Sequence, residues 1–318
     1  MLEKKKYSVI SLFAWCGGLD LWFLWNFEAL GKKYTQNNFN LIWSNDINSD
    51  ACKSFEKNLK HKIECWDIRE LIKNNSLPEK CDIVLWWFPC QDFSHAWKRR
   101  GFASERGLLY KSMIEVIQKT NPLVFLAENV KWLLTMNDGG AIRTIISDFS
   151  EIGYNVNYRL IMAADYWVPQ KRERVIIVWT KKWELPVFEF SNPPIKEHQR
   201  ITAEQAIWDL ADLPEWEKEN HFWSKAKKNK WQWNKAIYKD KVAPTMRSEH
   251  HWNIEFHWNG KRRLSAREAA RIQSFPDDFI FYNSTSSAYR QIGNAVPPVV
   301  GWHLAQDIQN FLNKNIIF

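Results

Sequence analysis

Short apolar runs alternate with helical patterns through the first 180 residues of this chain. Strands are predicted over residues 7–14, 39–44, 82–85, 123–127, 154–163 and 174–180, and helices over residues 19–30, 49–59, 107–119 and 141–152. Strands that alternate with helices of 10–15 residues form parallel βαβ units, which assemble into one sheet with helices on both faces. We therefore predict an α/β fold with a doubly wound, mixed sheet. In such sheets ligands bind beyond the carboxyl ends of the strands.

The pattern changes after Thr180, where Pro, Lys, Trp and Asn become frequent and periodicity fades. At about 150 residues per domain, 318 residues suggest two domains. We predict that residues 1–185 plus 286–318 form the larger domain and that residues 186–285 form a smaller, irregular one. Helical patterns return at 265–273 and 296–312, and the last helix is expected to pack back on the larger domain.

Positive charge is concentrated in one segment. Residues 221–263 carry 11 Lys and Arg against 3 Asp and Glu, which accounts for the whole net charge of +8. A basic stretch of this kind indicates either a polyanion-binding face or a solvated lysine-rich surface. Charge alone does not separate the two interpretations.

The five cysteines include no Cys-x-x-Cys pair, which argues against a zinc site and a disulfide framework. We expect no bound metal and a reducing, cytoplasmic compartment. No apolar run approaches the roughly 18 residues of a membrane span, and no signal-peptide core follows the N-terminus, so no membrane partner is expected.

Two places in the first 50 residues suit a nucleotide-like cofactor. Residues 12–20 read as a strand, a turn containing Gly17 and Gly18, and a helix, so the backbone can approach a ligand closely. Asp46 follows the second strand, where a carboxylate can bind ribose hydroxyls. An ordinary turn and a helix N-terminal acid are the alternative interpretations.

Three further sites follow predicted strands. Cys90 lies in Phe-Pro-Cys-Gln after residues 82–85, where a thiolate is placed for nucleophilic attack, although buried cysteines are more often inert. Glu128, in Glu-Asn-Val, suits a general acid or a helix cap. Arg172 and Arg174 point to the same side of an extended backbone, as phosphate or carbonyl ligands or as surface charges.

Taken in order, these motifs resemble those of the cytosine-5 DNA methyltransferases. The set runs Leu-Phe-Ala-x-x-Gly-Gly, Phe-Pro-Cys-Gln, Glu-Asn-Val, Gln-x-Arg-x-Arg, Arg-Glu-Ala-Ala-Arg-Ile-Gln-Ser-Phe-Pro and Gln-Ile-Gly-Asn-Ala-Val-Pro-Pro. The resemblance spans nearly the whole chain. It implies a Rossmann-like catalytic domain that uses S-adenosylmethionine, and a target-recognition domain at residues 186–285.

The resemblance also implies roles for single residues. Cys90 would be the nucleophile that adds to carbon 6 of a cytosine flipped out of the helix. Glu128 would contact ring nitrogen 3 and the exocyclic amine, Arg174 would lie near the carbonyl, and Arg172 would accompany it. S-adenosylmethionine would be bound by Phe13, Gly17, Gly18, Asp46, Asp67 and Asn294.

DNA contacts are expected from Ser94, Lys98, Arg99, Arg100 and Arg247. A compact chain of this kind looks like a bacterial modification methylase. The implied partners are double-stranded DNA and a cognate restriction endonuclease, and a monomer is expected. Three alternatives remain: an inactive methyltransferase-like DNA-binding protein, an RNA cytosine methyltransferase, and a nucleotide-dependent oxidoreductase with an active cysteine.

Tryptophan stands where the family pattern has glycine. The chain has 20 Trp and 11 Gly, whereas average usage of about 7% predicts roughly 22 Gly. Ten tryptophans fall at such positions: Trp15, Trp22, Trp66, Trp86, Trp87, Trp97, Trp132, Trp167, Trp179 and Trp208. Backbone strain and overpacking at ten sites are expected to exceed a net stability of about 5–15 kcal/mol. We therefore expect poor folding and impaired cofactor binding unless glycine is restored.

Overall fold

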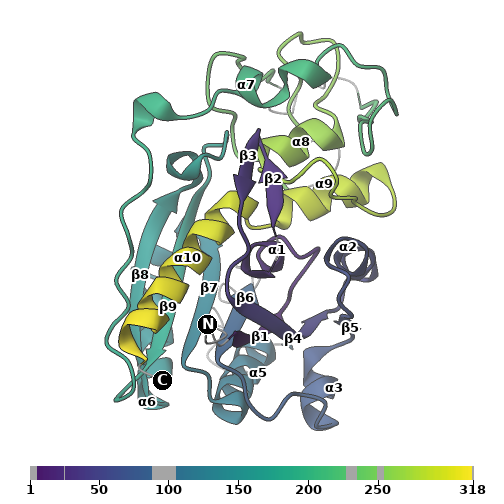
Figure 1. Cartoon of the computed structure of the whole chain (residues 1–318). Helices are drawn as coiled ribbons and strands as arrows, with labels where there is room; N and C mark the ends of the chain where they lie inside the picture. The colour runs from purple at the N-terminus through teal and green to yellow at the C-terminus, as the bar shows by residue number, and fades with distance from the viewer. Residues whose placement is uncertain (1–5, 25, 88–104, 227–234, 249–253, 317–318) are drawn as a thin grey trace, which may run out of the picture.

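A seven-stranded sheet forms the centre of the computed structural model, which describes residues 6–24, 26–87, 105–226, 235–248 and 254–316 (Figure 1). In spatial order the strands are β5 (Glu64–Cys65), β4 (Phe39–Asp46), β1 (Tyr7–Leu12), β6 (Ile83–Trp87), β7 (Val124–Val130), β9 (Glu173–Lys181) and β8 (Tyr154–Met162). The first five strands pair in parallel, whereas β9 runs antiparallel to both of its neighbours. The predicted mixed sheet is confirmed.

The chain order reverses between β1 and β6. From β1 the chain goes outward to β4 and β5, and then returns to the other side of β1 as β6. Such a reversal leaves a crevice at the carboxyl ends of the two central strands. The segments that follow Leu12 and Trp87 therefore begin at this point.

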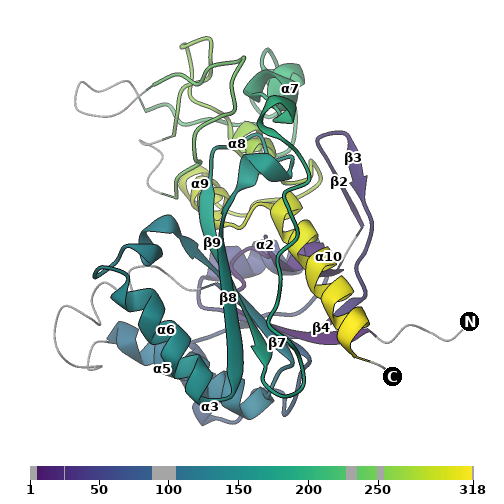
Figure 2. The same ribbon diagram turned by 90° about the vertical axis from the view of Figure 1, so that its left-hand side faces the viewer.

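Helices cover both faces of the sheet (Figure 2). One face packs against α3 (Ile68–Lys73), α5 (Glu105–Thr120) and α6 (Gly140–Glu151). The other packs against α1 (Asp20–Leu24), α2 (Ser49–Leu59) and α10 (Pro298–Asn315). Two layers of helices around one sheet are what the alternating sequence pattern predicted. The packing of α10 on the large domain is also confirmed.

Local signals explain where the helices begin. At α2 the Asn48 side chain accepts a hydrogen bond from the backbone N–H of Ala51, which satisfies one free N–H at the helix start. At α8 (Ala266–Ile272) Ser265 and Glu268 form a reciprocal capping box. Both helices were predicted within one residue of their observed ends.

The helix predicted over residues 19–30 is wrong beyond Leu24. A hairpin of β2 (Phe27–Ala29) and β3 (Lys32–Tyr34) follows α1. Leu30 and Gly31 both have positive φ, 52° and 70°, as a tight two-residue hairpin turn requires. Apolar periodicity did not reveal this turn, because only one of its two central residues is glycine.

Residues 186–285 are irregular, as predicted. In the described parts of this segment the helices are α7 (Ala203–Ile207) and α8, and α9 (Thr285–Asn294) begins at its end. Short 3₁₀ turns complete the elements: η1 (Lys131–Leu134), η2 (Ala163–Tyr166), η3 (Glu197–Gln199) and η4 (Trp208–Leu210). The proposed division at residues 186 and 286 stays a prediction, since one apolar cluster includes side chains from both sides of it.

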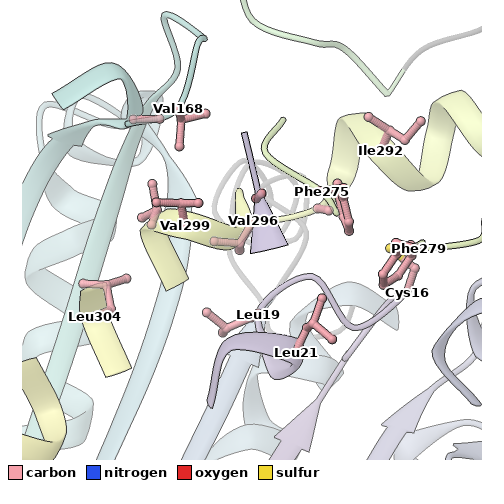
Figure 3. Packing of buried hydrophobic residues seen from close by; sticks show 14 of the residues in the cluster. Cys16, Leu19, Leu21, Val168, Phe275, Phe279, Ile292, Val296, Val299 and Leu304 are labelled. Carbon is pink, nitrogen blue, oxygen red and sulfur yellow. The ribbon is translucent and has the colours of Figure 1, made fainter. Parts of the chain in front are cut away.

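That apolar cluster fixes the loop after β1 (Figure 3). Cys16 and Leu19, from this loop, lie in the same cluster as Phe275, Ile292 and Val296. The segment that follows α8 and the segment around α9 therefore hold the loop from the side opposite the sheet. Among the described residues, no helix is both long enough and apolar enough to cross a membrane.

Candidate functional site

A cavity of about 570 Å³ opens at the carboxyl ends of the central strands. It is lined by residues from seven separate parts of the chain: Phe13, Trp15, Asp46, Ile47, Asn48, Trp87, Glu128, Asn129, Val130, Arg172, Arg174, Thr245, Met246, Arg247, Ser248, Gly293 and Asn294. Seven predicted site residues are among them. The structure thus brings together motifs that are up to about 280 positions apart, at the crevice that the strand order predicts.

The loop after β1 has an unusual backbone. Phe13, Trp15 and Gly17 all have positive φ, of 54°, 55° and 86°. At Gly17 a Cβ would also lie 2.7 Å from Leu59 Cδ1, so only glycine fits there without a shift. Gly18 and Phe13 line a second cavity of only about 10 Å³ behind the loop. The predicted turn between strand and helix is therefore present, and its role in cofactor binding stays a prediction; the cavity on its inner side has almost no free volume.

Asp46 ends β4 and is buried. Its two carboxylate oxygens accept hydrogen bonds from the backbone N–H groups of Trp15, at 2.9 Å, and Asn48, at 2.8 Å. Burial raises the pKa of this carboxyl above its ordinary value. A carboxylate has about four lone-pair sites, so Asp46 can fix the loop and still accept a hydrogen bond from a hydroxyl group.

Asp67 does not line the cavity. It caps the N-terminus of α3 and accepts hydrogen bonds from the backbone and side chain of Arg69. The Arg69 guanidinium lowers the pKa of the Asp67 carboxyl. A partner two residues along the chain thus engages the side chain that was predicted to read an adenine amino group.

Glu128 lies within β7 rather than after it, and pairs with Ile176 of β9. Its side chain is 3% exposed, and Oε1 lies 2.8 Å from Arg174 Nε. Oε2 accepts a hydrogen bond of 2.6 Å from the indole N–H of Trp87. The predicted pair of Glu128 and Arg174 is therefore in contact at the cavity wall, and a third side chain that was not expected there completes it.

Arg172 is fully buried and binds backbone. Its guanidinium donates to the carbonyl oxygens of Met246 at 3.2 Å, Gly293 at 3.0 Å and Ala295 at 3.1 Å. Burial, followed by the charge of Arg174, lowers its pKa well below the ordinary arginine value. Arg172 thus positions two loops of the cavity, whereas Arg174 faces a carboxylate.

Two glutamines reinforce the same junction, although their role was not predicted. The Gln170 side chain donates to the Ile272 carbonyl oxygen at 3.3 Å and accepts from the Met246 N–H at 2.9 Å. Gln273 donates to the carbonyl oxygens of Ile292 and Ala295 at 3.0 Å and 2.7 Å. Gln170 belongs to the Gln-x-Arg-x-Arg motif and Gln273 to the Ile-Gln-Ser-Phe-Pro motif. Membership of these motifs is the only feature of the sequence that indicated a role for either glutamine.

Gly293 permits the closest approach in this region. A Cβ on it would lie 2.3 Å from the carbonyl oxygen of Arg247, so any side chain would displace segment 245–248. Because Arg247 and Asn294 both line the cavity, the fit of α9 against this segment sets the shape of the wall. Thr245, Met246 and Ser248 join the site through this contact and were not predicted.

Several predicted residues lie outside the described parts of the chain. They are the proposed nucleophile and four proposed DNA contacts: Cys90, Ser94, Lys98, Arg99 and Arg100. Trp97 also lies outside them. Cys90 follows three positions after Trp87, the last residue of β6, which lines the cavity.

The basic segment 221–263 is partly internal. Arg262 donates to both carboxylate oxygens of Glu268 at 2.7 Å. Arg263 is buried and donates to the Ala226 carbonyl oxygen at 2.9 Å. These two arginines stabilise the fold and do not contribute to a polyanion-binding face. The number of basic residues in the segment is therefore larger than the number available to bind a polyanion.

Strain at tryptophan is confined to a few positions. Ten tryptophans stand at positions that resemble family glycines, and among the described ones Trp15 and Trp167 have positive φ. Trp183 and Trp216 also have positive φ, although the family pattern did not single them out. The other described positions of the ten do not have positive φ, so backbone strain of this kind does not arise there. Trp86 and Trp179 instead lie in strands, fully buried in the aromatic core.

Comparison with known proteins gives a consistent result. The sequence matches the family described as C-5 cytosine-specific DNA methylase over residues 7–252 and 223–310. It is 35% identical to the type II methyltransferase M.NgoFVII of Neisseria gonorrhoeae, over 98% of this chain and 89% of that protein. It is 36% identical to the type II methyltransferase M.FnuDI of Fusobacterium nucleatum, over 96% and 95% of the two chains.

Solved structures share the fold. The S. pombe Dnmt2 methyltransferase superposes with a TM-score of 0.70 at 18% identity, covering 97% of this chain and 99% of that one. The Entamoeba histolytica methyltransferase EhMeth superposes with a TM-score of 0.63 at 16% identity, covering 99% and 100%. At these identities the likeness concerns the fold alone.

Proposed function

Because this chain belongs to the C-5 cytosine-specific DNA methylase family and is a DNA cytosine-5 methyltransferase, we propose that it methylates carbon 5 of a flipped cytosine through a covalent adduct with Cys90. The observation that carries the proposal is the meeting of Glu128 and Arg174 at the cavity wall beside the end of β6. Cys90 follows that strand end in the sequence. The relatives of this chain named above are type II methyltransferases, which supports a role in a restriction-modification system with a cognate endonuclease.

The methyl donor that the family implies is S-adenosylmethionine, and the lining suits its adenosine half. Asp46 offers carboxylate oxygens for ribose hydroxyls, and the adjacent Ile47 is 67% exposed, which leaves an apolar surface free for a purine ring. Phe13 and Asn294 would border the methionine half, because both also line the 570 Å³ cavity, and Gly18 lies in the same loop as Phe13. When bound, the donor supplies an electrophilic methyl group.

The chain's own residues would supply the remaining chemistry. The Cys90 thiolate would form a bond to carbon 6 of the base, and this bond makes carbon 5 nucleophilic. Glu128 would accept a hydrogen bond from the exocyclic amine and, in its protonated form, would give its proton to ring nitrogen 3, which neutralises the negative charge that develops on the ring. Arg174 would hold Glu128 and the base carbonyl in place. After carbon 5 accepts the methyl group, it loses its proton, and the bond to Cys90 breaks.

Methyl incorporation into mixed-sequence DNA from labelled S-adenosylmethionine tests the proposal. We would compare this chain with a version that has Gly at positions 15, 22, 66, 86, 87, 97, 132, 167, 179 and 208, and with the Cys90→Ala variant of that version. We expect transfer by the glycine version, and loss of both transfer and a trapped 5-fluorocytosine adduct in the alanine variant. A folded, cofactor-binding glycine version without transfer would favour the DNA-binding alternative. Preferential transfer to competing RNA would favour the RNA methyltransferase.

A further inference from the structure

The indole of Trp87 contacts the buried carboxylate of Glu128 at the cavity wall. Trp87 is the last residue of β6 and lies beside Glu128 in the strand register. Its N–H donates to Glu128 Oε2 at 2.6 Å, the short distance typical of a hydrogen bond to a charged acceptor. The indole N–H and the exocyclic amine of cytosine are both N–H donors in the plane of an aromatic ring. They would therefore make the same kind of hydrogen bond to Glu128 Oε2.

The carboxylate has no exposed side left. Glu128 Oε1 forms an ion pair with Arg174 at 2.8 Å but accepts no hydrogen bond from a described residue, and the Glu128 side chain is only 3% exposed. A base can therefore contact Oε2 only after the indole of Trp87 has moved. Removing the indole also removes the one hydrogen bond that this buried carboxylate accepts from a described residue, which has a free-energy cost unless the base replaces it.

Trp15 keeps Trp87 in this position. The two ring centroids lie 6.2 Å apart, and the Trp15 indole N–H donates to the Gln291 carbonyl oxygen at 3.0 Å. The Trp15 backbone N–H is bound to Asp46. Trp15 and Trp87 line both the 570 Å³ cavity and the 10 Å³ cavity behind the loop, as do Phe13 and Asn294, so the two tryptophans are part of the boundary between the two cavities.

We propose that Trp87 is an internal competitor for the target base, so that this chain takes up cytosine only when the indole leaves Glu128. The inference rests on the proposed function, because it assigns Glu128 to the base. It predicts that the residue at position 87 sets the affinity for an unpaired cytosine and leaves other steps of DNA binding unchanged.

Short single-stranded oligonucleotides provide the test. One contains a single cytosine and the other has an abasic site in its place, and the ratio of their dissociation constants measures base uptake. We expect Trp87→Gly to increase this ratio about tenfold or more, the effect of one charge-assisted hydrogen bond. Trp87→Phe, which loses the N–H and keeps most of the ring, should give a smaller increase. Trp183→Gly is the matched control, because Trp183 is fully exposed, and it should leave the ratio unchanged.

A ratio for Trp87→Gly no higher than that of the parent would overturn the inference. An NMR experiment on the indole N–H groups gives a second way to overturn it. In protein labelled with ¹⁵N at the indoles, the signal lost in Trp87→Phe should be the one that moves most in Glu128→Gln, and an unmoved signal would show that the two groups do not interact. Neither measurement uses methyl transfer. If the Trp87→Gly variant gains cytosine affinity while the fully glycine-restored enzyme transfers no methyl group, the proposed function fails and this inference stands.

Discussion

The Arg172 guanidinium donates a hydrogen bond of 3.0 Å to the carbonyl oxygen of Gly293, 121 positions away along the chain. Two further carbonyls, of Met246 and Ala295, complete its partners. We predict that Arg172→Met lowers the free energy of unfolding by about 3 kcal/mol or more, because it leaves three buried carbonyls without a charged donor. Urea denaturation measures the change. Arg159→Met is the control, since Arg159 makes an exposed hydrogen bond and a cation–π contact with Phe190 at 5.2 Å, and its loss should cost only about 1 kcal/mol. Equal losses in the two variants would contradict the positioning role of Arg172.

Trp183 and Trp208 should respond in opposite directions to the same substitution. Trp183 is fully exposed and has a φ of 68°, a conformation that costs a non-glycine residue about 1–2 kcal/mol. Trp208 is 68% exposed and has the right-handed helical φ of −58°. We predict that Trp183→Gly stabilises the chain by about 0.5–1 kcal/mol, after the entropy that glycine adds to the unfolded state. Trp208→Gly should destabilise it by a similar amount. Chemical denaturation that gave the same sign for both would refute the argument from φ.

Trp179 should tolerate phenylalanine better than alanine. Its ring is buried and stacks on Phe125 with a centroid distance of 4.3 Å, but its indole N–H has no hydrogen-bond partner among the described residues. Trp179→Phe retains the stacking and removes the unsatisfied donor, so we expect a change in unfolding free energy within about 1.5 kcal/mol. Trp179→Ala leaves a cavity and should cost about 3–5 kcal/mol. The same denaturation experiment compares them, and a larger loss for phenylalanine than for alanine would be incompatible with this packing.

Asp20 should make stability depend on pH. Burial raises the pKa of its carboxyl from 3.8 to about 7. Between these two values the folded chain binds the proton more tightly than the unfolded chain does, so the contribution of Asp20 to the unfolding free energy falls as pH rises from about 4 to about 7. Above pH 7 it stays level. Asp20→Asn removes this contribution, and the difference between the two unfolding curves measured from pH 4 to pH 8 isolates it. Parallel curves would mean that Asp20 titrates normally in the folded chain.

The doubly wound sheet could be predicted because strand and helix patterns alternate clearly, and the strand order then places the cavity. The hairpin of residues 27–34 could not, because Leu30 adopts a turn conformation that its residue type disfavours. Helix periodicity simply continued through it. Local sequence therefore predicted the elements and failed where a single backbone conformation decided the outcome.

The candidate site divides in the same way. Glu128, Arg174 and Asp46 were predicted because each ends or borders a strand at the sheet's carboxyl edge. Asp67 was expected in the cavity, but its near neighbour Arg69 engages it. The partners of Arg172 are backbone carbonyls more than 70 positions away, and no local pattern reveals such contacts. Trp87 was singled out only as an unexpected residue type, because its hydrogen bond to Glu128 requires the strand register.

Left-handed turns at Trp15, Trp167, Trp183 and Trp216 also bear on the gene. Glycine is the residue that such turns favour, and the codon UGA is decoded as tryptophan in some genetic codes and as glycine in others. We predict that these four positions and position 87 are encoded by UGA. Trp302, whose indole N–H donates to the Thr35 carbonyl oxygen at 2.8 Å, should be encoded by UGG. Sequencing the gene decides this. A host that translates UGA as glycine would relax all four turns and free Glu128 in a single step, so that the genetic code of the cell would determine whether this enzyme is open to its substrate.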